Sequence, residues 1–189
     1  MENRIELAKH FATLGFTKGA EIGVCWGRYS EILCRHNPKL HLLAVDDWRK
    51  SRTWESYEGT KVRLANLNVT IDRRPSMKAV IDVADESLDF VFIDANHEYT
   101  AVRDDIREWA KKVRVGGIVS GHDYYKTPAG NMGVINAVNE YVAEHGYTLL
   151  LTDKVLLSSG QAGMPLGGSW DRLMVDDRPP CWYFTKTSG

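Results

Sequence analysis

The chain has 189 residues, of which 43% are hydrophobic and 26% are charged, and its formal net charge is −1 at pH 7. This composition is typical of one globular domain, which we expect to span 1–189, and the balanced charge gives no general attraction to nucleic acid. No apolar run approaches the roughly 18 residues that a membrane helix needs, so we expect no membrane partner either.

Helical and strand-like patterns alternate along the chain. Helical segments carry apolar residues three and four positions apart, and strand-like segments are short apolar runs. In chain order we predict a helix at 5–14, a strand at 20–24, a helix at 30–36, a strand at 40–45, a loop at 49–59, a helix at 62–67 and strands at 69–72 and 88–93. The second half continues with a helix at 101–113, a turn at Gly116 and Gly117, a strand at 118–120, a helix at 134–142 and strands at 147–152 and 181–186.

The order of these elements predicts the α/β class, with a Rossmann-like, doubly wound and mostly parallel sheet of seven strands. The run LDFVFI at 88–93 is almost entirely apolar, which is typical of a central strand buried on both faces. The last two strands have no helix between them, so we expect an antiparallel C-terminal hairpin at the sheet edge. The segment 157–180 is rich in Gly, Pro and Ser and is predicted to be a lid or substrate loop.

A tight turn between the first strand and the next helix predicts a nucleoside-cofactor site. In AEIGVCWGRYS, at 20–30, Gly23 and Gly27 permit the turn, and amide groups at the helix start face the space above it. A dinucleotide turn has glycines at its first, third and sixth positions, and here Cys25 stands at the third. A side chain at that position disfavours a dinucleotide.

Acidic residues near this turn predict how a nucleoside would be held. Asp46 closes the second strand, where a carboxylate can accept both hydroxyl protons of a ribose, and Asp47 follows it. Trp48 has two interpretations, stacking on an adenine face or packing in the core. Glu21 ends a buried strand and needs a partner, either turn amides or a ligand ammonium group. Ser30 either caps the helix or contacts the carboxylate of the cofactor.

Polar residues also follow two neighbouring buried strands, in IDANHEY at 93–99 and GGIVSGHDY at 116–124. Ligands bind at the carboxyl ends of strands in open α/β sheets, so we expect the two clusters to converge. Asp94, His122 and Asp123 could ligate a divalent ion, with Asn96 or water completing the shell, and oxygen-rich ligation favours Mg²⁺. Alternatively, the two acids only cap the following segments or hydrogen-bond through His97 or His122.

Glu21, Gly23 and Gly27 form an E-x-G-x-x-x-G arrangement that resembles the first motif of class I S-adenosylmethionine-dependent methyltransferases. The terminal hairpin is a feature of that fold. The later motifs are similar to those of bacterial small-molecule O-methyltransferases with I-D-x-x-H-x-Y and G-G-x-x-x-x-H-D-Y patterns.

This resemblance implies several further residue roles. It implies S-adenosylmethionine as the cofactor and adenine contacts at Ser76 and Met77, which follow the third strand. Asp94 is expected among the cofactor contacts, and Asp94 and Asp123 match metal-ligand positions. His122 stands where the catechol and macrolide sugar enzymes usually carry Asp, which leaves metal dependence open.

The expected function is methyl transfer from S-adenosylmethionine to a small hydroxylated metabolite or sugar. The sulfonium methyl group is already activated, so the protein mainly positions the acceptor. His97 or His122 can act as general base, whereas a bound Mg²⁺ would lower the pKa of the acceptor hydroxyl. Two alternatives are a non-catalytic cofactor- or partner-binding domain and an NAD-dependent oxidoreductase, the latter disfavoured by Cys25.

The cysteines bear on the cellular compartment. The chain has three cysteines, an odd number, at spacings unlike those of a zinc site. Together with the absence of a charged-then-apolar signal segment, this predicts a cytoplasmic protein with reduced thiols. The sequence leaves homo-oligomer formation open.

Overall fold

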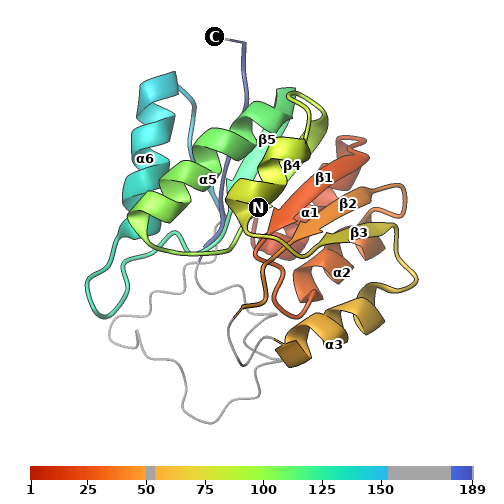
Figure 1. Cartoon of the computed structure of the whole chain (residues 1–189). Coiled ribbons are helices and arrows are strands. Elements are labelled where there is room, and N and C mark those ends of the chain that lie inside the picture. Colours follow the sequence, from red (N-terminus) through yellow and green to blue (C-terminus); the bar gives the residue numbers. More distant parts are fainter. Residues whose placement is uncertain (50–53, 153–179, 189) are drawn as a thin grey trace.

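The computed structural model describes residues 1–49, 54–152 and 180–188. In chain order its elements are α1 (Arg4–Thr13), β1 (Lys18–Ile22), α2 (Arg28–His36), β2 (His41–Val45), α3 (Trp54–Leu64), β3 (Val69–Asp72), α4 (Ser76–Ala79), η1 (Val80–Asp82), β4 (Leu88–Ile93), α5 (Tyr99–Lys112), β5 (Val113–Gly121), α6 (Gly133–His145), β6 (Leu150–Leu151) and β7 (Trp182–Thr185). Figure 1 shows the sheet with helices on both faces. The predicted 157–180 loop lies outside the described residues except for Pro180.

The described strands form one seven-stranded sheet in the order β3-β2-β1-β4-β5-β7-β6. The pairs β1–β2, β1–β4, β2–β3 and β4–β5 are parallel, whereas β7 is antiparallel to both β5 and β6. The predicted α/β class, the mostly parallel doubly wound sheet and the antiparallel C-terminal hairpin are confirmed. Strand β6 is shorter than the predicted strand at 147–152.

Strand β4 separates two hydrophobic cores. Phe90 and Phe92 point into a core that α1 and α2 cover, while Val91 and Ile93 point into a second core under α5 and α6. All four side chains are buried, because successive side chains of a strand face opposite sides of the sheet. The predicted central position of this strand is therefore confirmed.

The sequence prediction is wrong about the bounds of helix α3. It begins at Trp54, inside the predicted 49–59 loop, and ends at Leu64, before the end of the predicted helix at 62–67. Its buried positions include Ser56, Thr60 and Leu64, spaced four apart on one face. Because two of these three residues are polar, hydrophobic periodicity does not reveal this helix.

The predicted turn at Gly116 and Gly117 is also wrong. Strand β5 begins at Val113, directly after α5, and both glycines lie inside it, where the pairing register with β4 shifts. Gly116 has φ +79°, a conformation that glycine adopts without strain, and its N–H donates to the Lys186 carbonyl at 2.8 Å. The two glycines therefore form an irregularity within a strand.

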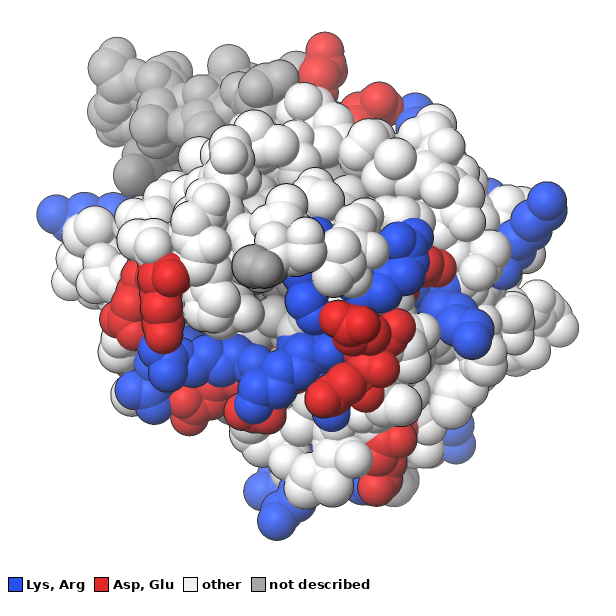
Figure 2. Space-filling model, turned by 90° about the horizontal axis from the view of Figure 1, so that it is seen from above, with Lys and Arg blue, Asp and Glu red and all other residues white. Residues whose placement is uncertain are grey.

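The surface carries charges of both signs. In the view of Figure 2, Lys and Arg side chains lie between Asp and Glu side chains without a large patch of one sign. Exposed ion pairs such as Lys111–Glu108, at 2.7 Å, bring opposite charges together on the surface. Among the described residues, no helix combines the length and the apolar character that a membrane crossing requires.

Asp89 joins three strands at the edge where β1 and β4 begin. Its carboxylate accepts hydrogen bonds from the Thr17 and Lys18 amides, at 2.7 and 2.9 Å, and from Arg114 Nε at 2.8 Å. Burial alone would raise the pKa of Asp89, but these hydrogen bonds hold it below its ordinary value. The resulting stabilisation is present above the unfolded-state pKa and is lost as the pH falls through the folded-state pKa.

We predict that Asp89→Asn lowers the free energy of unfolding at neutral pH by about 1–2 kcal/mol, because the charged acceptor is lost. The difference in stability between the variant and wild type should shrink below about pH 3.5. There the Asp89 carboxyl of the unfolded wild-type chain is protonated, so folding no longer gains the full benefit of the charged acceptor. Urea denaturation at neutral pH and below about pH 3.5 measures the free energy of unfolding of both proteins. Glu108→Gln, which removes an exposed partner of exposed Lys111, is the control and should change stability little. An equal loss for Asp89→Asn at both pH values would contradict the charge-based explanation.

Candidate cofactor and active site

The β1–α2 turn lies directly against the end of β4. Gly23 has φ +93°, and a Cβ atom there would overlap the backbone carbonyl of Asp94. The Asp94 amide in turn donates to the Ile22 carbonyl at 2.7 Å. Cys25 also has positive φ, +52°, and Gly27 is the N-cap residue of α2. Only glycine fits at position 23, and the turn and the first polar cluster are thereby in backbone contact.

Asp46 connects this turn to the end of β2. One carboxylate oxygen accepts the Cys25 amide at 2.9 Å and the other accepts the Trp48 amide at 2.9 Å. A carboxylate has about four lone-pair sites, so both oxygens can still accept another hydrogen bond. The two backbone amides fix Asp46 in place. Asp47 is half-buried beside it and accepts the Arg49 amide at 3.1 Å.

Trp48 is a core residue that contacts the turn. Its side chain is only 2% exposed, its indole N–H donates to the Cys25 carbonyl at 2.8 Å, and its ring packs 4.9 Å from that of Tyr57. The core interpretation therefore holds, and an open stacking face is not observed. Thr60 also donates to the Cys25 carbonyl, at 2.9 Å. Tyr57 and Thr60 lie on α3, so the sequence prediction missed this support.

Glu21 and Ser30 form a buried pair at the base of the turn. Glu21 is 2% exposed, and the Ser30 hydroxyl donates to its carboxylate. Burial raises the pKa of Glu21 to about 8, with the Ser30 hydrogen bond acting against this rise. The interpretation of Ser30 as a helix cap is wrong, because Gly27 is the N-cap residue of α2 and no side chain caps that helix.

The polar clusters after β4 and β5 converge. His97 Nε2 lies 3.0 Å from Asp123 Oδ2 and 3.4 Å from Asp94 Oδ1. His122 Nδ1 lies 3.2 Å from Asp123 Oδ1 and 3.9 Å from Asp94 Oδ2. Ligand atoms of Asp94, His97 and Asp123 all lie within 4.8 Å of one another. The group that could hold a metal ion thus contains His97 in place of the predicted His122, whereas exposed Asn96 accepts the nearby Glu98 amide.

A proton on His97 offsets part of the negative charge of this cluster. Hydrogen bonds to Asp123 and Asp94 raise the pKa of His97 to about 10, so its imidazole carries a proton at neutral pH. Burial would raise the pKa of Asp123, but hydrogen bonds from His122 and His97 hold it well below its ordinary value. A protonated His97 cannot accept a proton, so this state of the cluster does not offer His97 as a base.

Ser76 and Met77 begin the short helix α4. The Ser76 hydroxyl donates to Asp105 and accepts the Trp109 indole N–H at 2.8 Å, and both partners belong to α5. Met77 is half-buried against the core under α5 and α6. The Ser76 hydroxyl therefore hydrogen-bonds to residues of α5.

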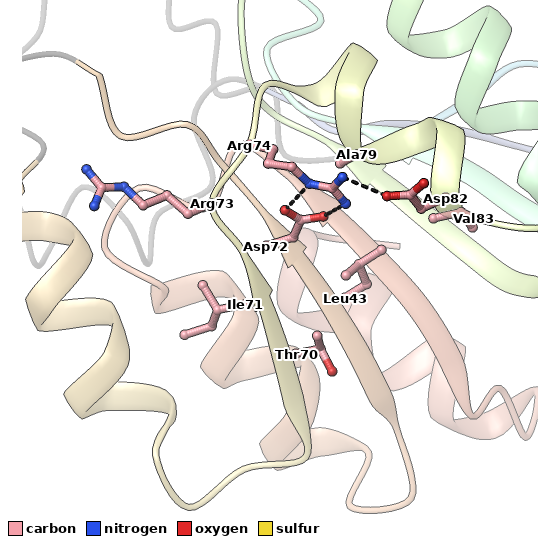
Figure 3. Close-up of a pocket in the computed structure, with 9 residues that line it drawn as sticks. All are labelled: Leu43, Thr70, Ile71, Asp72, Arg73, Arg74, Ala79, Asp82 and Val83. Carbon is pink, nitrogen blue, oxygen red and sulfur yellow. Dashed lines mark hydrogen bonds and ion pairs between the residues drawn. The ribbon is translucent and has the colours of Figure 1, made fainter.

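A pocket of about 330 Å³ lies on the sheet face at the β3 edge and contains no predicted site residue (Figure 3). Arg74 spans its rim, 2.6 Å from both Asp72 and Asp82. Its lining residues are Leu43, Thr70, Ile71, Asp72, Arg73, Arg74, Ala79, Asp82 and Val83. The guanidinium of Arg74 already has two carboxylate partners, so we do not place the cofactor here.

Comparison with solved structures shows the same fold in methyltransferases of diverse origin. The O-methyltransferase TomG from Streptomyces achromogenes, involved in tomaymycin synthesis and determined with S-adenosylmethionine, has a TM-score of 0.66 and 17% identity, over 98% of this chain and 80% of that one. The O-methyltransferase from Bacillus cereus, in complex with S-adenosylhomocysteine, has a TM-score of 0.65 and 15% identity, over 97% and 80%. A candidate rRNA methylase from Clostridium thermocellum has a TM-score of 0.67 and 14% identity, over 100% and 98%.

Sequence comparison identifies the family. A search of curated proteins finds no match. A family model described as a methyltransferase domain matches residues 20–124, from the first strand to the end of the second polar cluster and more than half of the chain. The chain therefore belongs to this methyltransferase domain family.

Proposed function

We propose that this protein transfers a methyl group from S-adenosylmethionine to a small hydroxylated metabolite or sugar. One observation carries the proposal: the Gly23 turn lies against the Asp94 backbone while Asp46, one strand away, is fixed with acceptor capacity remaining. A nucleoside with an amino-acid arm requires these two features side by side. The family match and the cofactor-bound structures of the Streptomyces and Bacillus enzymes support the proposal.

The strand order suggests how the cofactor lies. The order β3-β2-β1 puts the turn after β1, Asp46 after β2 and Ser76 beyond β3. With the amino-acid arm at the turn near Glu21 and the ribose at Asp46, the adenine ring points toward Ser76 and Met77. Because Trp48 is buried, this arrangement does not use it as a stacking surface.

The reaction would take place beside the convergent polar cluster. The bond from the methyl carbon to sulfur breaks as the bond to the acceptor oxygen forms, and sulfur keeps the electron pair. The hydroxyl proton must pass to a base. Since His97 is protonated at neutral pH, His122 is the histidine that we propose for this role.

The donor set also fits a divalent cation. Asp94 and Asp123 supply the carboxylates that hard ions prefer, and His97 would have to release its proton to act as a third ligand. When bound, Mg²⁺ would lower the pKa of the acceptor hydroxyl and orient it. We therefore include Mg²⁺ as an optional cofactor.

A small acceptor agrees better with the charge balance of the chain than RNA does. The net charge is −1, which gives no general attraction to a phosphate backbone, whereas RNA-binding domains are typically basic. We propose a single domain. We also propose a cytoplasmic location, because the chain has an odd number of cysteines, three, and a reducing compartment keeps thiols reduced.

Two measurements separate this proposal from its alternatives. S-adenosylhomocysteine should raise the melting temperature and NAD should not, because a ligand that binds only the folded state stabilises it. Radiolabelled S-adenosylmethionine should then transfer its methyl group to a member of a panel of phenols, catechols and sugars. Binding without transfer to any acceptor would favour a non-catalytic cofactor-binding domain, and a response to NAD alone would favour an oxidoreductase.

Removing the proposed ribose contact should weaken cofactor binding. We predict that Asp46→Ala reduces the affinity for S-adenosylhomocysteine by about 1–3 kcal/mol, because hydrogen bonds to a charged acceptor are lost. Isothermal titration calorimetry measures this change, and circular dichroism checks that the fold is retained. Asp104→Ala, which removes an exposed acid that pairs with Arg103, is the control. Equal affinities for Asp46→Ala and wild type would remove the ribose assignment.

Cofactor binding should release a proton from Glu21. With a pKa of about 8, this carboxyl is mostly protonated at neutral pH, and a ligand ammonium group beside it would lower that pKa. We therefore predict release of about one proton per bound S-adenosylhomocysteine at neutral pH, and affinity that rises with pH toward the pKa of the free carboxyl. Calorimetry in two buffers of different ionisation enthalpy counts the protons. Glu21→Gln should release none, and an unchanged proton count in this variant would exclude Glu21 as the source.

Charge removal at the polar cluster should affect chemistry more than binding. We predict that Asp123→Asn lowers kcat by about 100-fold, because it disrupts the group beside the proposed base, while the Kd for S-adenosylhomocysteine changes less than about threefold. Steady-state kinetics with an acceptor from the panel and calorimetry give the two quantities. Asp85→Asn controls for the loss of one negative charge. Equal effects on kcat and Kd would instead indicate a structural role.

A further inference from the structure

Asp105 is a buried acid that the proposed reaction does not use. It lies on α5 and is only 4% exposed. Among the described residues, the buried acids are Glu21 and Asp105, and Glu21 already has a place beside the cofactor turn. The position of Asp105 therefore needs an explanation of its own.

The side chain of Asp105 belongs to a three-residue network. Its carboxylate accepts a hydrogen bond from the Ser76 hydroxyl, which in turn accepts the Trp109 indole N–H at 2.8 Å. Asp105 and Trp109 are four residues apart and so lie on the same face of α5. Ser76 donates its only hydroxyl proton to Asp105, and this fixes the rotamer of Ser76.

Stability alone does not account for this arrangement. Burial raises the pKa of Asp105 to about 6, with the Ser76 hydrogen bond acting against this rise. Burying a carboxyl is unfavourable, and one hydrogen bond offsets only part of the loss. An apolar side chain would fill this position at a smaller energetic cost, whereas a carboxylate gives the Ser76 hydroxyl a fixed direction.

The network holds the segment that follows β3. Ser76 is the first residue of α4, and Arg74, two residues earlier, is held between Asp72 and Asp82 (Figure 3). Two separate sets of contacts thus hold the start of α4. In the proposed function, this is where the adenine ring of the cofactor points.

We propose that Asp105 is a positioning residue for the adenine ring: together with Trp109 it fixes Ser76, and through Ser76 the start of α4, against the base. This inference rests on the proposed binding of S-adenosylmethionine. Because the Ser76 hydroxyl proton is directed to Asp105, recognition of the base depends on where the segment lies and on Met77, and not on hydroxyl donation.

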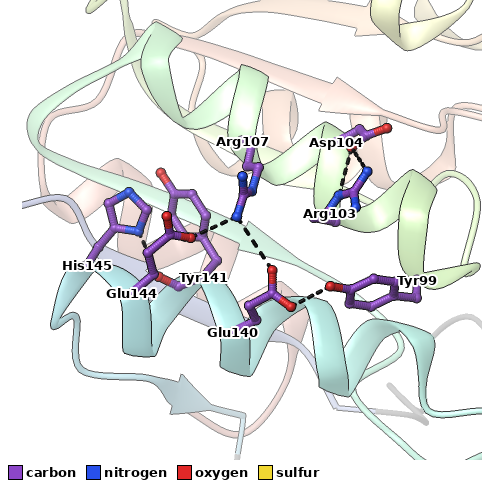
Figure 4. A network of polar contacts seen from close by, with 8 residues as sticks. All are labelled: Tyr99, Arg103, Asp104, Arg107, Glu140, Tyr141, Glu144 and His145. Atoms are coloured by element: carbon purple, nitrogen blue, oxygen red, sulfur yellow. Dashed lines mark hydrogen bonds and ion pairs between the residues drawn. The ribbon is translucent and has the colours of Figure 1, made fainter.

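The test compares two ligands and three variants. The ligands are S-adenosylhomocysteine and the analogue in which hypoxanthine replaces adenine. We expect Asp105→Leu to weaken S-adenosylhomocysteine binding about tenfold and to reduce the discrimination between the two ligands. Asp105→Asn keeps a carbonyl acceptor for Ser76 and should stay within about threefold of wild type. Asp104→Asn removes an adjacent exposed acid that pairs with Arg103 (Figure 4) and should change nothing.

The outcomes are separable. An Asp105→Leu variant that binds both ligands as wild type does, or that weakens both by the same factor, would overturn the positioning role. If Asp105→Leu does not fold, Ser76→Ala tests the same network, and unchanged discrimination in that variant would overturn the inference. A folded wild-type protein that binds no S-adenosylhomocysteine would overturn the proposed function, and this inference with it.

Discussion

The close contact between the backbone at Gly23 and the carbonyl of Asp94 is the constraint on which the rest of the site depends. No side chain fits between them, so the turn after β1 and the loop after β4 are held together by main-chain atoms. Asp46 then connects the same turn to β2 through the Cys25 amide. Three strand ends are thereby fixed relative to one another before any ligand contributes.

Electrostatics divides the site into two parts. Near the turn, Glu21 is buried with a hydroxyl partner and has a raised pKa, so it can respond to a positively charged ligand. At the ends of β4 and β5, His97 already supplies a positive charge between Asp94 and Asp123. The proposed cationic cofactor and hydroxyl acceptor would occupy these two different environments.

The sequence predicted the sheet well because apolar periodicity reports burial, and strands such as β4 are buried on both faces. It failed at α3, where Ser56 and Thr60 are buried although both are polar, and the Thr60 hydroxyl donates to the Ser56 carbonyl. In the site, the convergence of two polar clusters was predictable from strand order. The partners of Trp48 and Ser30 were not, because a residue type does not determine which of several hydrogen bonds it makes. Nothing in the sequence indicated that Asp105 is buried, because a single acid in an amphipathic helix looks like a surface residue.

The position of Asp89 has a consequence for how such a protein can change. Its three hydrogen bonds join the beginnings of β1, β4 and β5, while the candidate site lies where β1, β2, β4 and β5 end. The hydrogen bonds that stabilise the scaffold and the residues of the candidate site thus lie at opposite edges of one sheet. Loops at the reactive rim can diversify toward new acceptors while the far rim keeps the scaffold intact, which makes this architecture a favourable starting point for directed evolution.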